Sequence, residues 1–338
     1  MAQELSLGKY RGMQSIANER GIITVAALDH RGSFKKMLQQ AMPGQEIGYN
    51  EVVEEKLNMV RIFAPLSSAV LLDPIYGAAA AVTSRALPGS VGLLVALEQS
   101  GYEGGDFARV TPITPGWSVE KIKRMGAAAV KLLLYYNPEG ETATQQEDLV
   151  KRVAEECDAH DIALLLEPMS YSLTPDVKKS SAEFAERKPE LVLESARRLS
   201  GLGIDLLKAE FPADPHYEKD ESKLREYARE LTNISPVPWV ILSAAETFDV
   251  FQPLVEIACE EGASGYMVGR AVWQEAMVLP TADERNRELE TTGRSRMAIL
   301  NAIADYRAKP WYASYPAPST SEGWQKEYGS FSAAVSRV

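Results

Sequence analysis

The sequence has few of the residues and segments that mark several large classes of protein. Its only two cysteines, Cys157 and Cys259, have no CxxC partner, so we expect buried free thiols and a cytoplasmic location. Three scattered histidines form no recognisable metal motif, which disfavours a metal-dependent mechanism. No apolar run has spanning length and Met1 to Arg11 is polar and mixed, so we expect neither membrane association nor a signal peptide.

The composition that remains is typical of a globular protein. The chain has 338 residues, of which 45% are hydrophobic and 25% are charged. Its formal net charge of −11 argues against a nucleic-acid-binding surface. An acidic protein can still bind a small anionic substrate, provided that the pocket itself is locally positive.

Short apolar runs alternate along the chain with segments of helical spacing. The expected strands cover residues 22–29, 69–73, 91–97, 128–136, 162–167, 203–212, 237–243 and 265–270. The expected helices cover residues 45–63, 119–125, 142–160, 180–200, 219–232 and 248–261. Eight strands in about 250 residues predict a (β/α)8 TIM barrel over residues 1–273. A doubly wound open sheet is the competing fold, but no GxGxxG turn follows the first strand.

The remaining residues, 274–338, predict a C-terminal helix to Ala308 and then an aromatic-rich tail. Its aromatic residues are Trp311, Tyr312, Tyr315, Trp324, Tyr328 and Phe331. Because aromatic side chains mainly contribute buried area, we expect the tail to pack on the barrel or on a neighbouring subunit. A lid over the substrate is the alternative.

One expected strand, residues 203–212, carries a lysine among apolar residues. With a period of two, Leu206, Lys208 and Glu210 point to one face of the strand. A buried lysine is explained either by a salt bridge or a side chain that reaches water, or by an amine that acts as a nucleophile.

Charged residues at the carboxyl ends of other strands favour the nucleophile. Lys131, Glu167 and Lys208 lie on successive strands and are expected to converge, and Asp29 ends the first strand. Burial and a second ammonium would lower the pKa of Lys208 from about 10.4 toward about 7–8, and the neutral amine could form a Schiff base with a ketone. Glu167 would then move protons during dehydration, and Asp29 would take the proton of a substrate hydroxyl. A buried ion pair without catalysis is the alternative.

A second set of residues predicts an anion site. Ser243 ends the seventh strand, and Gly269 and Arg270 end the eighth, where backbone amides of this fold commonly hold a phosphate. An arginine that bridges helices on the exterior is the alternative reading. After Asp29, His30 is expected to be a hydrogen-bonding loop residue, and Arg31 follows it.

At these residues the chain resembles the class I tagatose 1,6-bisphosphate aldolases and their relatives that cleave 6-deoxy-6-sulfofructose 1-phosphate. The matching segments are residues 27–32, 71–77, 130–136, 165–168, 205–212, 239–244 and 263–273. The Asp-Pro-x-Tyr-Gly and Leu-Leu-Tyr-Tyr segments and the long tail fit the tagatose branch better than the sulfosugar branch.

The resemblance implies an aldolase that needs no cofactor. Lys208 would form the Schiff base with the ketose or with dihydroxyacetone phosphate, and Glu167 would be the acid and base. Asp29 and Lys131 match further active-site positions. The products would be dihydroxyacetone phosphate and glyceraldehyde 3-phosphate, or sulfolactaldehyde in the sulfosugar branch. The small-molecule partner would be a sugar phosphate substrate. We also expect the protein to be a homo-oligomer.

The same resemblance implies that Ser243, Gly269 and Arg270 surround the phosphate of the dihydroxyacetone half, with His30 and Arg31 also at the substrate. Two positions depart from the family pattern. His30 stands where both branches usually have glutamine. Ala245 and Glu246 follow Ser243-Ala244 where a glycine is usual, and Glu246 adds a negative charge there.

Two other functions remain open from the sequence. One is a barrel enzyme of another class, such as a phosphosugar isomerase or a metal-dependent lyase, which a chelator would inactivate. The other is a non-catalytic sensor of a sugar phosphate, which would bind its ligand without turnover. The sequence does not determine the distal group of the substrate or the stereochemistry at its C4.

Overall fold

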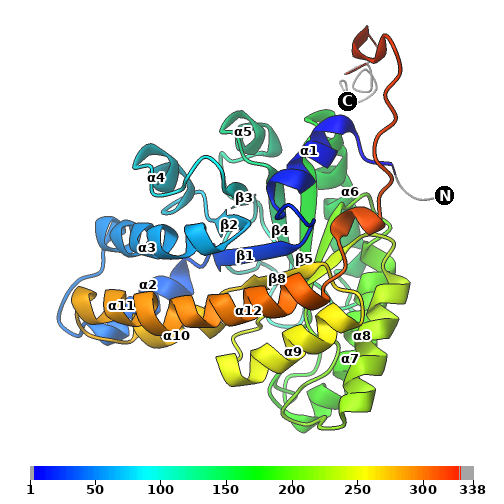
Figure 1. The fold of residues 1–338 in the computed structure, drawn as a ribbon. Helices are drawn as coiled ribbons and strands as arrows, with labels where there is room; N and C mark the ends of the chain where they lie inside the picture. The colour runs from blue at the N-terminus through cyan, green and yellow to red at the C-terminus, as the bar shows by residue number, and fades with distance from the viewer. Residues whose placement is uncertain (1–3, 327, 329–338) are drawn as a thin grey trace.

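Eight parallel strands close into a barrel in chain order, from β1 to β8, and β8 pairs with β1 (Figure 1). A computed structural model of the chain describes residues 4–326 and residue 328. The strands are β1 (Ile23–Leu28), β2 (Ala69–Leu72), β3 (Gly92–Ala96), β4 (Ala129–Tyr135), β5 (Ala163–Met169), β6 (Leu206–Ala209), β7 (Trp239–Leu242) and β8 (Gly265–Val268). The expected TIM barrel is therefore confirmed.

Helices surround the barrel and connect its strands (Figure 1). They are α1 (Leu7–Ser15), α2 (Gly32–Ala41), α3 (Tyr49–Phe63), α4 (Ala78–Thr83), α5 (Val119–Arg124), α6 (Ala143–Ala159), α7 (Ala182–Leu199), α8 (Glu221–Ile234), α9 (Phe248–Glu260), α10 (Arg270–Met277), α11 (Ala282–Glu288) and α12 (Arg294–Arg307). Helices α1, α2 and α4 were not expected from the sequence, and each has only six to ten residues.

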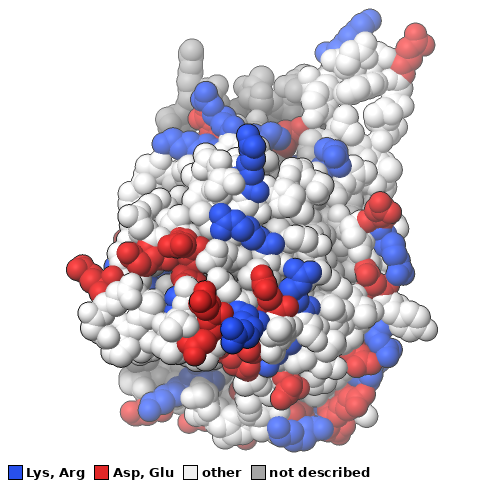
Figure 2. Space-filling view, turned by 60° about the vertical axis from the view of Figure 1, so that its left-hand side comes forward, with Lys and Arg blue, Asp and Glu red and all other residues white. Residues whose placement is uncertain are grey.

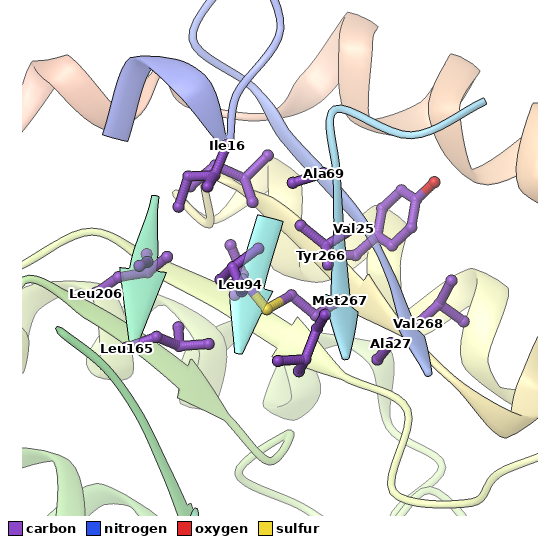
Figure 3. Packing of buried hydrophobic residues seen from close by; sticks show 14 of the residues in the cluster. Ile16, Val25, Ala27, Ala69, Leu94, Leu165, Leu206, Tyr266, Met267 and Val268 are labelled. Atoms are coloured by element: carbon purple, nitrogen blue, oxygen red, sulfur yellow. The ribbon is translucent and has the colours of Figure 1, made fainter. Parts of the chain in front are cut away.

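Apolar side chains fill the barrel interior below the charged strand ends. Val25 and Ala27 precede Asp29 on the inward row of β1, Leu165 precedes Glu167 on β5, and other inward rows have the same pattern. Figure 3 shows this packing, with Val25, Leu94, Leu165, Leu206 and Met267 from five strands gathered inside the barrel. The next inward side chain on each of these strands, such as Asp29 or Glu167, therefore lies at the carboxyl end of the strand.

Helix α1 closes the opposite, amino-terminal end of the barrel. Ile16, directly after α1, is fully buried, and its carbonyl oxygen accepts a 2.7 Å hydrogen bond from Ser68 Oγ just before β2. A Cβ on Gly12 would lie 2.5 Å from a carbonyl oxygen at the start of β4, and one on Gly92 would lie 2.2 Å from the last carbonyl oxygen of α1. Both glycines therefore allow α1 to lie directly against the strands.

Two aromatic residues of the tail pack at this same amino-terminal end. Trp311 is buried against Tyr10 of α1, with their ring centroids 4.9 Å apart. The Tyr315 hydroxyl donates a 2.8 Å hydrogen bond to the carbonyl oxygen of Asp205, just before β6. This part of the tail therefore lies away from the carboxyl ends of the strands. Tyr312, Trp324 and Tyr328 are exposed, and Phe331 lies outside the described residues.

Several expected boundaries differ from the structure, and two of them involve a proline. The helix expected over residues 274–308 is interrupted, because Pro280 cannot continue it and Thr281 begins α11 with a capping box to Glu284. A π-helical turn over Leu289–Gly293 then joins α11 to α12. Strand β5 also continues through Pro168, because by that point β6 no longer pairs with it and the missing N–H breaks no hydrogen bond to β6.

The surface carries charges of both signs. On the face shown in Figure 2, lysine and arginine side chains lie beside aspartate and glutamate side chains rather than forming one field of a single sign. Among the described residues, no helix has the length and apolar character needed to cross a membrane.

Candidate functional site

Four charged side chains meet at the carboxyl ends of the barrel strands. Glu167 Oε1 lies 2.8 Å from Lys208 Nζ, and Glu167 Oε2 lies 2.9 Å from Lys131 Nζ. Lys131 Nζ also donates a 2.8 Å hydrogen bond to Asp29 Oδ2 on the other side of the barrel. The four residues of the sequence prediction are thus connected in one row, in the order Lys208, Glu167, Lys131 and Asp29.

A fifth residue of this cluster, Glu98, was missed by the sequence analysis. It lies two residues after β3, and its Oε1 accepts a 2.8 Å hydrogen bond from Lys131 Nζ. Its Oε2 accepts a 3.0 Å hydrogen bond from the Leu133 N–H. Glu98 follows the expected strand 91–97 directly, so the rule that located the other four residues would have found it too.

The pKa values of these groups follow from burial and their neighbours. Burial alone would lower the pKa of Lys131, but the charges of Asp29, Glu167 and Glu98 raise it well above its ordinary value. Burial would raise the pKa of Glu167, but Lys131 and Lys208 hold it below its ordinary value. Burial is outweighed in the same way at Asp29, whose pKa is lowered mainly by Lys131. At neutral pH Lys131 is therefore an ammonium among carboxylates.

A cavity of about 540 Å³ opens over this cluster. All nine site residues expected from the sequence line it: Asp29, His30, Arg31, Lys131, Glu167, Lys208, Ser243, Gly269 and Arg270. Its charged side chains are these two lysines and two arginines and the three carboxylates of Asp29, Glu98 and Glu167. With four cations against three anions, the cavity is locally positive although the chain carries a net charge of −11.

Arg31 joins the wall of this cavity to the segment after β3. Its Nη2 donates a 2.7 Å hydrogen bond to the carbonyl oxygen of Glu98, and its Nη1 lies 3.5 Å from Thr114 Oγ1. Its Nε is buried without a hydrogen-bond partner among the described residues. Arg31 therefore fixes the backbone of Glu98 and keeps one donor free.

The other side of the cavity is formed by the residues after β7 and β8. Arg270 is the first residue of α10, whose first turn has free N–H groups, and burial lowers the pKa of Arg270. The Gly269 N–H donates a 3.4 Å hydrogen bond to Ser243 Oγ, which ties the two strand ends together. A helix N-terminus with an arginine and a hydroxyl suits an anionic group.

The two residues after Ser243 have an unusual backbone. Ala244 and Ala245 have φ angles of 46° and 69°, in the left-handed region that glycine favours, and both line the cavity. The chain thus keeps a glycine-like conformation where the resembling family usually has glycine. Glu246 does not line the cavity, because its Oε2 pairs with His216 Nε2 at 2.8 Å.

Glu210 does not share the direction of Lys208, so that part of the sequence prediction is wrong. Its Oε2 accepts hydrogen bonds from the N–H and Oγ of Ser170, at 2.8 and 2.6 Å, and its Oε1 pairs with Lys179. It lines a small void beside α7 together with Leu207. Strand β6 ends at Ala209, so the alternation of faces no longer holds at Glu210.

No group of three or more histidine, cysteine, aspartate or glutamate side chains among the described residues is arranged to hold a metal ion. The chemistry that the cavity can support with its own side chains is that of an amine beside a carboxylate. A lysine amine can attack a carbonyl carbon, and the adjacent carboxylate can transfer the protons that this addition requires.

The family model of the DeoC/LacD family aldolases matches residues 23–275, which include the whole barrel and all of these site residues. A curated relative from Listeria monocytogenes serotype 4b, a tagatose 1,6-diphosphate aldolase, is 32% identical and the match covers 92% of this chain and 96% of the relative. Tagatose 1,6-diphosphate aldolase 1 of Streptococcus mutans serotype c is 31% identical over 88% of this chain and 96% of its own length.

The fold is also similar to solved structures. One, of a Schiff-base-forming fructose-1,6-bisphosphate aldolase, aligns with a TM-score of 0.58 at 21% identity and covers 88% of this chain and 99% of that structure's chain. The matched family model spans the barrel strands that carry the five clustered charged residues of the cavity, and the curated relatives align over nearly the full length. The chain belongs to the DeoC/LacD family of aldolases.

Proposed function

We propose that this protein is a class I aldolase that cleaves tagatose 1,6-bisphosphate into dihydroxyacetone phosphate and glyceraldehyde 3-phosphate. The observation that carries the proposal is the buried Lys208 amine, which faces the cavity 2.8 Å from Glu167. The substrate is proposed from the curated relatives, which are tagatose 1,6-diphosphate aldolases at 31–32% identity.

The geometry supports each proton transfer of Schiff-base formation. Glu167 takes a proton from the Lys208 ammonium, and the neutral amine attacks the substrate ketone at C2. The resulting carbinolamine loses its hydroxyl as water when Glu167 returns the proton. Lys131 stays charged beside Glu167 and stabilises the carboxylate that each of these steps regenerates. The product is a protonated imine on Lys208.

The imine then serves as the electron acceptor for cleavage. The C3–C4 bond breaks, its electron pair moves into the imine to give an enamine, and C4 leaves as the aldehyde. The hydroxyl on C4 must lose its proton in this step to a group of the cavity wall. Protonation of the enamine and hydrolysis of the imine release dihydroxyacetone phosphate and restore Lys208.

The proposed substrate carries two phosphate groups, and the cavity carries more cationic than anionic side chains. Arg270 and the first turn of α10 are placed to hold the phosphate on C1, with Ser243 and Gly269 beside it. Arg31 lines another part of the cavity and adds a second guanidinium charge there.

A cleavage assay tests the proposal. Tagatose 1,6-bisphosphate, fructose 1,6-bisphosphate and 6-deoxy-6-sulfofructose 1-phosphate are compared at equal concentration, with the release of dihydroxyacetone phosphate as readout. We expect the highest kcat/KM for tagatose 1,6-bisphosphate and at least a 10³-fold loss in Lys208→Met, because the nucleophile is removed. The matched control Lys223→Met, at an exposed lysine, should keep full activity. Full activity in Lys208→Met would refute the proposal.

We further propose that the protein is a cytoplasmic homo-oligomer. Cys157 and Cys259 are both free thiols, which suits a reducing compartment. Tyr49 and Tyr306 are exposed aromatic residues that suit contact with another subunit. Light scattering coupled to size-exclusion chromatography measures the mass, and a mass of 37.1 kDa would refute oligomerisation.

A further inference from the structure

His30 is held in a defined place beside the candidate catalytic cluster. It follows Asp29 at the end of β1 and lines the cavity. Its ring packs edge-on against Trp273, with the centroids 5.0 Å apart. A Cβ on Gly269 would lie 2.9 Å from His30 Cε1, so the glycine leaves the room that the imidazole occupies. The ring is thus fixed by its neighbours.

The two ring nitrogens of His30 have different surroundings. Nδ1 is buried, has no hydrogen-bond partner among the described residues, and lies 3.9 Å from Asp29 Oδ1. The side chain as a whole keeps 21% of its surface exposed. Because Nδ1 is not part of that exposed surface, Nε2 is the nitrogen that a substrate in the cavity can reach.

Asp29 also determines which nitrogen of His30 carries the proton. The carboxylate is held in place by Lys131, which binds its Oδ2 and keeps its pKa low. Its other oxygen faces Nδ1, so the field of the anion favours the proton on Nδ1. The lone pair of the neutral ring is then on Nε2, directed at the cavity. Asp29 itself is engaged on both oxygens, by Lys131 at Oδ2 and by the approach of His30 Nδ1 to Oδ1.

We propose that His30 is a catalytic residue that accepts the proton of the substrate's C4 hydroxyl through Nε2, with Asp29 as its positioning residue. The inference rests on the proposed aldolase function and deepens it. In the step, the hydroxyl proton moves to Nε2 while the C3–C4 electron pair enters the imine on Lys208. The positive charge therefore moves from the imine to the imidazole, and the net charge of the site is unchanged.

The charged groups that face His30 fit this role. Burial lowers the pKa of His30 to about 3, and Arg270, Lys56 and Lys208 lower it further while Asp29 raises it. The free imidazole is therefore neutral at pH 7, with Nε2 unprotonated, but it is a weak base until the substrate binds. A substrate phosphate bound at Arg270 would offset one of the opposing cations, and enamine formation would remove the charge of the imine. Both changes strengthen the base during the reaction.

His30 also stands where the resembling family usually has glutamine. An amide of similar reach can hydrogen-bond a hydroxyl but cannot accept its proton at neutral pH. His30→Gln is therefore a conservative test, because it keeps the hydrogen bonding and fits the position in the relatives. The protein has only three histidines, so the signals of His30 can be assigned by their loss in this variant.

Two reactions separate the role of His30 from that of Lys208. Exchange of the C3 hydrogens of dihydroxyacetone phosphate in D2O, followed by NMR, needs the imine and enamine but no C4 hydroxyl. Cleavage of tagatose 1,6-bisphosphate needs the imine and enamine and also the loss of the proton from the C4 hydroxyl. In His30→Gln we expect the exchange rate to stay within about threefold of the wild-type rate. We expect the cleavage rate to fall on the order of 10²-fold, which is the lower end of the rate enhancement that a general base contributes. Equal cleavage by both proteins would overturn the inference, as would an equal loss of both reactions.

The position of the proton is tested on the free protein. Nitrogen-15 NMR of the imidazoles should show His30 neutral at pH 7 with its proton on Nδ1, and Asp29→Ala should move the proton toward Nε2. A proton on Nε2 in the wild-type protein would overturn the inference. If the wild-type protein shows neither exchange nor cleavage, the proposed aldolase function itself is refuted, whatever tautomer His30 adopts.

Discussion

Replacing Lys131 by methionine should destabilise the protein strongly. The Lys131 ammonium lies 2.8–2.9 Å from three carboxylates, those of Asp29, Glu98 and Glu167. Methionine fills nearly the same space but has no charge, so three buried or half-buried anions would lose a shared partner. Glu167 would keep the Lys208 ammonium and Glu98 would keep the Arg31 guanidinium at 3.7 Å. Asp29 would therefore be left without a lysine or arginine partner among the described residues.

The magnitude follows from what it costs to leave a buried charge unpaired. Removing one partner of a buried ion pair typically costs about 3–5 kcal/mol. For a chain of 338 residues the entropy of unfolding is about 0.7 kcal/mol per kelvin. We therefore expect the Tm of Lys131→Met to fall by about 4–7 °C at pH 7. The exposed pair Lys223–Glu218 provides the control, and Lys223→Met should change the Tm by about 1 °C or less.

The loss should depend on pH. In the wild-type protein the pKa of Asp29 is lowered on folding. The ionised Asp29 therefore contributes to the free energy of unfolding above the pKa it has in the unfolded chain, and this contribution is lost as the pH falls toward the lower pKa of the folded protein. In Lys131→Met the opposing ammonium is gone, so burial raises the pKa of Asp29. The folded variant then binds a proton at mildly acidic pH, and the difference in free energy of unfolding between the variant and the wild-type protein becomes smaller. Thermal unfolding of both proteins from pH 8 to pH 5 measures this. A loss of less than about 1 kcal/mol in the free energy of unfolding, or a loss that stays constant over this pH range, would refute the reasoning.

Three further predictions use other parts of the site. Ala245→Gly should raise the free energy of unfolding by about 1 kcal/mol in chemical denaturation, because the alanine is held at φ 69°; a loss of stability would contradict this. Arg270→Ala should raise the KM for the bisphosphate by about 10- to 100-fold. The KM for dihydroxyacetone should change little, because this compound has no phosphate for Arg270 to bind. Neither cysteine should react with a thiol reagent at pH 8 before unfolding, since burial raises the pKa of Cys157 and brings that of Cys259 to about 12.

The sequence was sufficient to locate most of the site because strand ends are where this fold presents its chemistry. Lys131, Glu167 and Lys208 each follow an apolar inward residue on parallel strands, so their convergence followed from the period of two and the order of the strands. The fold itself was predictable for the same reason, because the alternation of apolar runs and helical segments repeats along residues 22–270.

What could not be predicted depends on where strands stop and on contacts between distant segments. Glu210 was placed on the face of Lys208 because nothing in the sequence shows that β6 ends at Ala209. The direction of Glu246 is set by His216, thirty residues away. Helix α1 has no strong apolar periodicity, because it closes the end of the barrel through glycine contacts rather than through one apolar face.

The central claim is that the amine of Lys208 forms a covalent imine with the substrate. Incubation with dihydroxyacetone phosphate and sodium borohydride should reduce that imine to a stable secondary amine. Mass spectrometry of the digested protein should then find one added group on the peptide that contains Lys208 and none on the peptide that contains Lys131. An adduct on a different lysine, or an unmodified and fully active enzyme, would contradict the account.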